Sequence, residues 1–428
     1  MFTNLIIIIM TVFFSFRVLT MNNGIELSLN YIVVFFILGY RTFEILPGLR
    51  FHPIEIICFF TILRLLIQRP KKYNYMPRSI KILSIFFIAY FIIDILTRYD
   101  PIVINEFKNT FNIFIMFFIL QYIRISEKNI IKITQTYFIV TSMISIIGVA
   151  EFLFPSLISD IFGFSNYKVS PNKGYLFHRI GFLFWGSHLA ANLIPPIFPI
   201  AIFLRARSHY LVKNNFILTF FLLVNLFAIY LSGNRISWLI LTVFLILIIL
   251  QNRNYLIPFL KPYSLFITIG FIIFIYSQPV EGRYISTYRA LIGRIDKRYD
   301  SSGANRMAKL SSSISSIKEY PMGTGWSSQG WVHSDIFQIA STMGIIPGFI
   351  LIFSVLSLTW KIFIIYIRNL LDSTLFLMIL CFMIFVLISL FLNGNFLLIQ
   401  TGMPLILFWA LSDYFYKGPK RTAERIYF

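Results

Sequence analysis

Arg235 stands where a phosphate group could be held. It lies in LSGNRISWL (231–239), where two apolar segments meet across a four-residue turn, and it falls in the first turn of the second segment. A permanent cation there adjoins free backbone N–H groups and the positive end of a helix dipole, which both attract anions. The alternative is an arginine that extends its side chain to lipid head groups.

A second polar group lies in YLFHRIGFLFWGSHLAANLIPPIFPIA, from 175 to 201. Arg179 precedes an apolar segment, and His188 and Asn192 fall inside it, about one helical turn apart. Because polar groups inside a bilayer are costly, they mostly face a cavity or a partner helix. His188 is therefore either a substrate contact or a histidine hydrogen-bonded between helices, and Arg179 is either a phosphate ligand or an interface anchor. Glu151 is a candidate carboxylate partner.

His333 opens the apolar stretch WVHSDIFQIASTMGIIPGFI (331–350) and could act as a general base near neutral pH. Asp335 follows two residues later, so the two side chains diverge on a helix and Asp335 is expected to cap it instead. The pattern indicates no catalytic dyad. A structural role at the helix start is the alternative for this histidine.

A polar segment of unusual length precedes His333. Residues 279–333 hold eight Lys or Arg, Arg306 among them, against four acidic residues. Within it, ANRMAKLSSSISSIKEYP predicts a short amphipathic helix that rests an apolar stripe on the helix bundle. The glycines of MGTGW, Gly323 and Gly325, predict a tight turn. We therefore expect a folded segment. The stripe comprises Met307, Leu310, Ile314 and Ile317.

The elements that carry these residues are apolar and long. The chain has 428 residues, of which 58% are hydrophobic and 13% charged, whereas soluble domains carry about 25% charged residues. Apolar runs near the roughly 20 residues needed to cross a bilayer recur throughout. We expect an all-α polytopic membrane protein with 12 or 13 transmembrane helices, the first of them retained. The expected spans are 4–20, 27–45, 52–69, 78–97, 105–124, 130–154, 180–204, 215–232, 236–252, 262–278, 334–362, 372–392 and 395–414.

The positions of Lys and Arg in the short loops predict the orientation, because such residues favour the cytoplasmic side. One set of loops holds most of them, including Arg205, Arg207 and Lys213. Residues 279–333 then lie outside, as does the turn at Arg235. The chain divides into a helix bundle over 1–278, a large extracytoplasmic loop over 279–333, C-terminal helices over 334–414 and a cytoplasmic tail over 415–428. The net charge of +20 indicates anionic lipid or a lipid-linked anion, not nucleic acid.

Four motifs, in this order, resemble the O-antigen polymerase and O-antigen ligase family. They are HRIGFLFWGSHLA, SGNRISWL, NRMAKLSSSISSIKEYPMGTGW and HSDIFQIASTMGIIPG, and together they cover about 175 to 350. Two details depart from the family pattern. Ser334 follows the histidine where asparagine is common, and an extra residue precedes Gly348.

The resemblance implies a fold like that of GT-C-type membrane glycosyltransferases in a bacterial cytoplasmic membrane. It implies an inverting reaction, without metal or cofactor, on oligosaccharide linked to undecaprenyl diphosphate, for O-antigen (lipopolysaccharide) or capsule synthesis. Arg179 and Arg235 would hold the diphosphate, and Arg306 would assist them or order the loop. His333 would orient or deprotonate the acceptor hydroxyl, and His188 would contact the substrate. Membrane lipid and a chain-length regulator are the other expected partners.

Three alternatives stay open at this stage. A ligase would transfer polymer to lipid A-core instead of joining repeat units. A flippase for lipid-linked sugar would share the membrane composition, but it predicts internal repeats, and none is visible. A sensor or scaffold would perform no chemistry, and removal of the basic side chains would then leave the polysaccharide unchanged.

Overall fold

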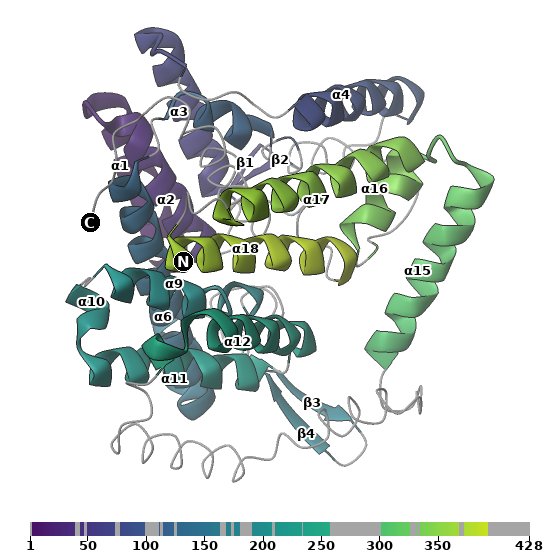
Figure 1. Ribbon diagram of the computed structural model, residues 1–428. Coiled ribbons are helices and arrows are strands. Elements are labelled where there is room, and N and C mark those ends of the chain that lie inside the picture. The colour runs from purple at the N-terminus through teal and green to yellow at the C-terminus, as the bar shows by residue number, and fades with distance from the viewer. Residues whose placement is uncertain are drawn as a thin grey trace. The chain divides into compact units, whose positions relative to one another are not determined.

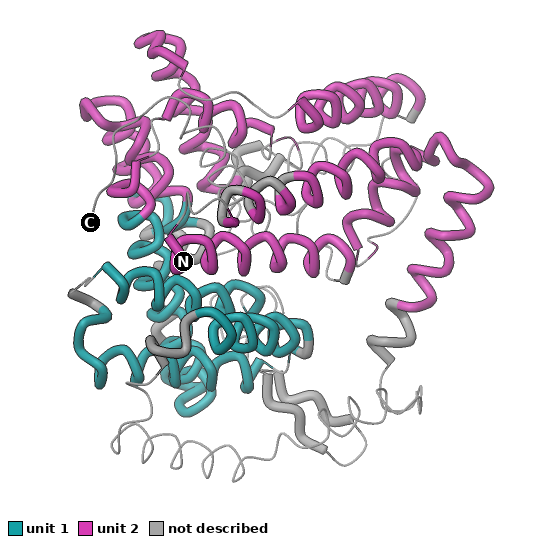
Figure 2. The backbone as a smooth tube through the Cα atoms, viewed as in Figure 1, with its two compact units in different colours: residues 1–9, 33–40, 131–304 teal, residues 10–32, 41–130, 305–428 magenta. Residues whose placement is uncertain are grey.

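The chain is mostly helical in a computed structural model (Figure 1). The structure describes residues 2–38, 43–46, 49–72, 78–98, 111, 114–123, 126–162, 168–172, 175–179, 191–207, 210–232, 234–256, 301–325, 332, 334–367 and 372–392. It forms two compact units, coloured separately in Figure 2. Unit 1 comprises 1–9, 33–40 and 131–304; unit 2 comprises 10–32, 41–130 and 305–428.

Most of the predicted apolar segments are helices. Four helices among the described residues are long and apolar enough to cross a membrane: most of α4 and α18 and all of α6 and α11. The chain is therefore a membrane protein. The predicted spans 262–278 and 395–414 lie outside the described residues, and 105–124 and 180–204 are described in part. The matching helices are α1 (Phe2–Thr20), α2 (Gly24–Leu38), α3 (Pro53–Gln68), α4 (Arg78–Arg98), α6 (Glu127–Leu153), α11 (Asn215–Ser232), α12 (Arg235–Leu256) and α18 (Ser373–Leu392).

The single span predicted over 334–362 is wrong. Two helices occupy this stretch, α16 (Asp335–Met343) and α17 (Ile345–Ile367), and they meet at Gly344. Gly344 has φ +104°, which a helix cannot accommodate. Glycine alone adopts such a conformation without steric cost, so the break is encoded at this residue.

Polar contacts between helices hold part of unit 1 together. Asn225 on α11 accepts a hydrogen bond from Ser145 on α6 (2.7 Å) and donates to Ser142 (3.1 Å) and to the Phe221 carbonyl (2.7 Å). These side chains are buried, and each bond satisfies a polar group that would otherwise be costly. Unit 1 also contains α7 (Pro155–Phe162), β3 (Lys168–Asn172), β4 (Tyr175–Arg179), α9 (Ile197–Ala206) and α10 (Tyr210–Lys213).

The core of unit 2 is built around α17, which contacts α4, α16 and α18. In the same unit, α3 begins with a capping box: the His52 side chain accepts from the Ile54 backbone amide (3.2 Å), and Glu55 accepts from the His52 backbone amide (2.6 Å). A short antiparallel hairpin precedes it, β1 (Phe43–Leu46) with β2 (Leu49–Phe51). The unit also contains most of α15 (Ser301–Glu319).

Candidate functional site

The turn before Arg235 is a helix start built by side chains. Helix α11 ends at Ser232, and α12 begins at Arg235, as the sequence predicts. Asn234 caps α12, because its Oδ1 accepts from the Ile236 amide (3.1 Å). The backbone N–H of Asn234 in turn donates to Ser232 Oγ (3.2 Å). The guanidinium of Arg235 itself lies outside the described part of the chain.

Asn192 fixes this helix start from a distant part of the sequence. Its Oδ1 accepts from Asn234 Nδ2 (2.9 Å) and from Ser237 Oγ (2.9 Å). Asn192 and Ser237 are fully buried, and Asn234 is nearly so. Nδ2 of Asn192 has no hydrogen-bond partner among the described residues. The first turn of α12 is therefore held in a buried polar framework with a spare donor.

Arg179 ends a strand that the sequence analysis did not predict. The antiparallel hairpin of β3 and β4 pairs Arg179 with Lys168 and Tyr175 with Asn172. β4 contacts α11, the helix that leads to the Arg235 turn. Alternating aromatic residues next to Gly174 were the available signal for the hairpin. The backbones of Arg179 and Arg235 thus belong to the same unit, whereas both side chains lie outside the described part.

The backbone on each side of His333 is anchored. The Val332 amide donates to Gln338 Oε1 (2.7 Å), and Ser334 Oγ donates to the Leu390 carbonyl on α18 (3.0 Å). Helix α16 begins at the buried Asp335 with Ser334 at the N-cap, so the expectation that Asp335 caps this helix is wrong. His333 and His188 both lie outside the described residues.

The glycine turn joins the polar segment to the break between α16 and α17. The Thr324 and Gly325 amides donate to the carbonyls of Ser341 and Thr342 (both 3.0 Å), and the Ile345 amide donates to the Pro321 carbonyl (3.0 Å). Gly323 and Gly325 have φ of +93° and +94°. The predicted tight turn is therefore present, and it is docked on the end of α16.

The helix predicted in the polar segment is present as α15, but only part of its apolar stripe is covered: Leu310 and Ile317 are half-buried. Met307 and Ile314 of the apolar stripe are exposed, at 61% and 37%. The buried face instead carries Ser313 and Ser316, and Ser313 Oγ donates to Ser341 Oγ on α16 (3.1 Å). Small side chains let two helices approach closely, so the contact between α15 and α16 is made through serines.

The described residues form two groups. Unit 1 holds the Asn192 framework with the backbones of Arg179 and Arg235. Unit 2 holds the anchored chain around position 333, the glycine turn and the backbone of Arg306 on α15. A site shared by Arg179, Arg235, Arg306 and His333 remains a prediction. Glu151 is buried on α6.

Among the described residues, no group of three or more His, Cys, Asp or Glu lies close enough to hold a metal ion. No model of a known protein family matches the chain, and no curated protein matches its sequence.

Proposed function

We propose that this chain is a polysaccharide polymerase of a bacterial cytoplasmic membrane. It joins oligosaccharide repeat units carried on undecaprenyl diphosphate, at the outer face of the membrane and without a metal. The observation that supports this most directly is the start of α12, where Arg235 follows an N-cap held in a buried polar framework.

A helix start of this kind suits a diphosphate for two reasons. The first amides of α12 point along the helix axis toward its start and carry the positive end of its dipole; the Ile236 amide among them is capped by Asn234. The arginine adds a permanent cation whose planar fork matches phosphate oxygens. Because Asn192 fixes Asn234 and Ser237, the amides are oriented before substrate binds. Such preorganised donors stabilise charge that develops on a leaving group.

The length of α11 supports a membrane crossing, which puts its two ends on opposite sides of the bilayer. Its 18 residues span about 27 Å, close to the roughly 30 Å hydrocarbon core of a bilayer. The basic residues Arg205, Arg207 and Lys213 lie before its start, and the Arg235 turn follows its end. If the basic end faces the cytoplasm, Arg235 reaches the outer surface.

The proposed reaction is an inverting displacement. The acceptor hydroxyl oxygen attacks the anomeric carbon of the donor sugar, and the bond from that carbon to the diphosphate oxygen breaks. The electron pair leaves with the lipid diphosphate, whose charge Arg179 and Arg235 balance. The hydroxyl proton passes to His333. Arg306 orders the polar segment that precedes His333, and His188 contacts the substrate.

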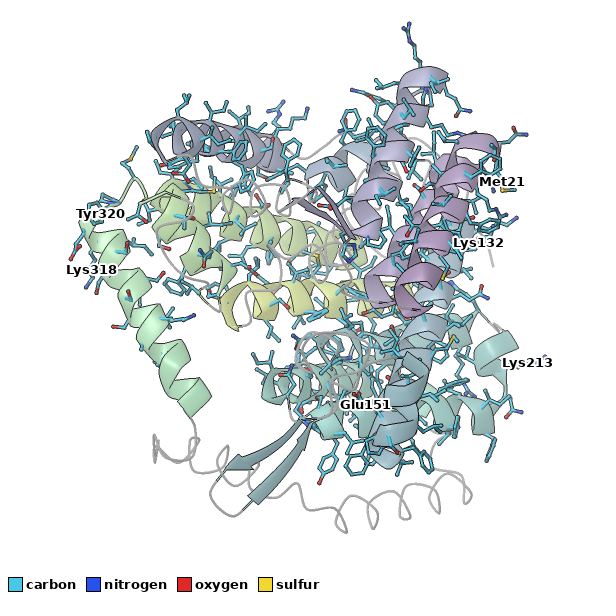
Figure 3. The ribbon with its side chains drawn as sticks, turned by 180° about the vertical axis from the view of Figure 1, so that it is seen from behind. Met21, Lys132, Glu151, Lys213, Lys318 and Tyr320 are labelled. Atoms are coloured by element: carbon cyan, nitrogen blue, oxygen red, sulfur yellow. The ribbon has the colours of Figure 1, made fainter. Side chains whose placement is uncertain are left out.

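Product analysis of variants in the source cell tests this function. Arg235→Ala should abolish long-chain polysaccharide while the protein remains inserted, because the cation on the leaving group is lost. Arg235→Lys should be impaired too, since an ammonium lacks the planar fork. Lys213→Ala is the matched control, because this exposed cation lies on α10 (Figure 3) and should leave the ladder unchanged. A normal ladder from Arg235→Ala would contradict the proposal.

Purified protein with lipid-diphosphate repeat units distinguishes a polymerase from a ligase. A polymerase forms products of two, three and more units from this single substrate. Transfer to a lipid A-core acceptor alone, with no joining of repeat units, would replace the polymerase with a ligase.

A further inference from the structure

Helix α15 has three sides of different chemistry. One side packs against α16 of the same unit, where Ser313 and Ser316 are buried and Ser313 Oγ donates to Ser341 Oγ (3.1 Å). A second side is apolar and a third is polar, and the members of each recur at intervals of three or four residues, which keeps them together on a helix. The apolar side comprises Met307, Leu310, Ile314 and Ile317, and the polar side includes Ser312, Ser315 and Glu319.

Protein covers the apolar side only where it borders the serines. Leu310 and Ile317, next to the serine side, are half-buried. Met307 and Ile314 lie farther round the helix and are exposed. Apolar side chains of an amphipathic helix gain free energy by entering the boundary between lipid head groups and acyl chains. The exposed part of the apolar side therefore suits a lipid surface.

The turn that follows α15 is attached to a membrane-crossing helix. The Tyr90 hydroxyl on α4 donates a hydrogen bond to the Met322 carbonyl. Tyr90 lies within Arg78–Thr97, the stretch of α4 that is apolar enough to cross a membrane, and about 10 Å along the helix axis before its end. Ile92 and Ile93, close to Tyr90 on the same helix, are exposed, as expected of residues that face lipid. The C-terminal end of α15 is therefore held at a level that lies within the membrane-crossing part of α4.

The direction of α15 differs from that of the spanning helices in its unit. In Figure 1, α4 and α18 run in much the same direction, whereas α15 crosses that direction steeply. A helix that is attached beside a spanning helix and runs across it follows the plane of the membrane. Amphipathic helices with one apolar side adopt this orientation at a lipid surface.

Lys318 lies at the boundary between the apolar and polar sides. It comes four residues after Ile314 and three after Ser315, in the last turn of α15, and its side chain is exposed (Figure 3). A lysine at such a boundary lays its stem along the apolar side and extends its ammonium to lipid phosphate groups.

We propose that α15 lies on the surface of the membrane, which is the outer leaflet in the orientation proposed above. Met307 and Ile314 enter the layer of acyl chains, Lys318 meets the phosphate groups, and Ser312 and Ser315 face water. The serine side stays on α16, so the helix contacts protein, lipid and water on three different sides. This position of α15 is independent of the reaction proposed above.

Fluorescence of single labels on the full chain in lipid nanodiscs tests this position. Met307→Cys and Ile314→Cys each receive a polarity-sensitive nitrobenzoxadiazole label, and the natural Cys58 and Cys381 are buried and give little background. Both labels should emit at a shorter wavelength than in water. Both should also lose fluorescence when the lipids carry nitroxide groups on their acyl chains.

Two positions on the polar side of the same helix serve as matched controls. Ser312→Cys and Ser315→Cys place the label at exposed positions. These labels should emit as in water, resist quenching by the lipid nitroxides and be quenched by iodide. Equal emission and quenching at Met307 and Ser315 would overturn the proposal. A blue-shifted Met307 label that lipid nitroxides do not quench would also overturn it, because a second copy or another protein would then cover the apolar side.

The depth of the labels tests the role of Lys318. A label on Lys318→Cys should be quenched most by a nitroxide on the lipid head group, whereas the Ile314 label should be quenched most by one on the acyl chain. The reverse order would exclude the proposed orientation of α15 about its axis.

Discussion

At the scale of single residues, Asn192 explains why Arg235 begins a helix in a fixed position. One amide oxygen accepts two hydrogen bonds from the first residues around the α12 start, and both donors are buried. A buried donor that loses an acceptor costs about 1–3 kcal/mol. The position of the Arg235 backbone thus depends on a residue 43 positions earlier in the chain.

Replacing this asparagine should lower both stability and product. Asn192→Ala leaves Asn234 Nδ2 and Ser237 Oγ without their shared acceptor, so we expect a loss of about 1–3 kcal/mol for each of the two donors. Thermal unfolding of purified protein and the polysaccharide ladder measure the two effects.

A second cap variant serves as the control. Asn214→Ala removes a comparable cap at the start of α11, where Oδ1 accepts from the Phe216 amide (2.9 Å). It should lower the melting temperature and spare the ladder. If both variants reduced product equally at equal stability, Asn192 would have no special relation to the site.

The residue-level predictions from sequence succeeded where the cause is local. The start of α12 at Arg235 and the positive φ of Gly323 follow from neighbouring residues in the chain. The partnership of Asn192 with Asn234 could not be predicted, because it joins residues brought together by packing. The side chains of the five predicted site residues lie outside the described part, so their roles remain proposals.

At the scale of elements, α15 is attached to α16 through serines. Ser313 is fully buried, and its hydroxyl donates a hydrogen bond to Ser341 Oγ. Lys318 lies in the last turn of α15 and Tyr320 directly follows the helix (Figure 3), where its carbonyl accepts from the Gly323 amide (2.9 Å). The serine contact and the turn therefore hold α15 to α16 at two points.

Enlarging the contact residue should detach α15. Ser313→Leu forces a bulky side chain into the interface, at a cost of about 1–3 kcal/mol. Limited proteolysis should then cut within 301–325 faster. Ser312→Leu, at the neighbouring exposed position, should be cleaved at the rate of the unchanged protein. Equal rates for the two variants would show that the serine contact does not hold the helix.

The glycine turn should be equally sensitive. A Cβ at Gly323 would lie 2.4 Å from the Thr342 carbonyl oxygen, and φ of +93° is strained for any other residue. Gly323→Ala should lower the melting temperature, with at least about 1–2 kcal/mol lost to backbone strain. Met322→Ala, which trims a side chain that is 70% exposed in the same turn, should change it little. A stable Gly323→Ala would argue against tight docking of this turn.

Sequence patterns predicted the long apolar helices because length and hydropathy alone identify them. They missed the break at Gly344, since Ile345, Ile346 and Pro347 continue the apolar run without a polar interruption. They also placed the whole apolar stripe of α15 inward, whereas Met307 and Ile314 are exposed. Amphipathicity shows which face is apolar, whereas the partner that covers a face depends on tertiary packing.

At the scale of the whole molecule, the charge pattern predicts a topology that labelling can test. Cys58 and Cys381 are buried, so they give little background with a membrane-impermeant thiol reagent. Arg235→Cys should react from outside intact cells, because the proposed orientation puts this turn at the outer surface. Lys213→Cys should react only after the cytoplasmic side is opened. The reverse pattern would exclude both the topology and the proposed site of reaction.

Binding of a short isoprenyl diphosphate to the full chain in lipid nanodiscs tests the central claim most directly. The unchanged protein should bind it, and Arg235→Ala should bind at least about tenfold more weakly, as expected for one lost ionic hydrogen bond. Lys213→Ala, which removes an exposed cation on α10, should bind like the unchanged protein. Unaltered diphosphate affinity in Arg235→Ala would contradict the account.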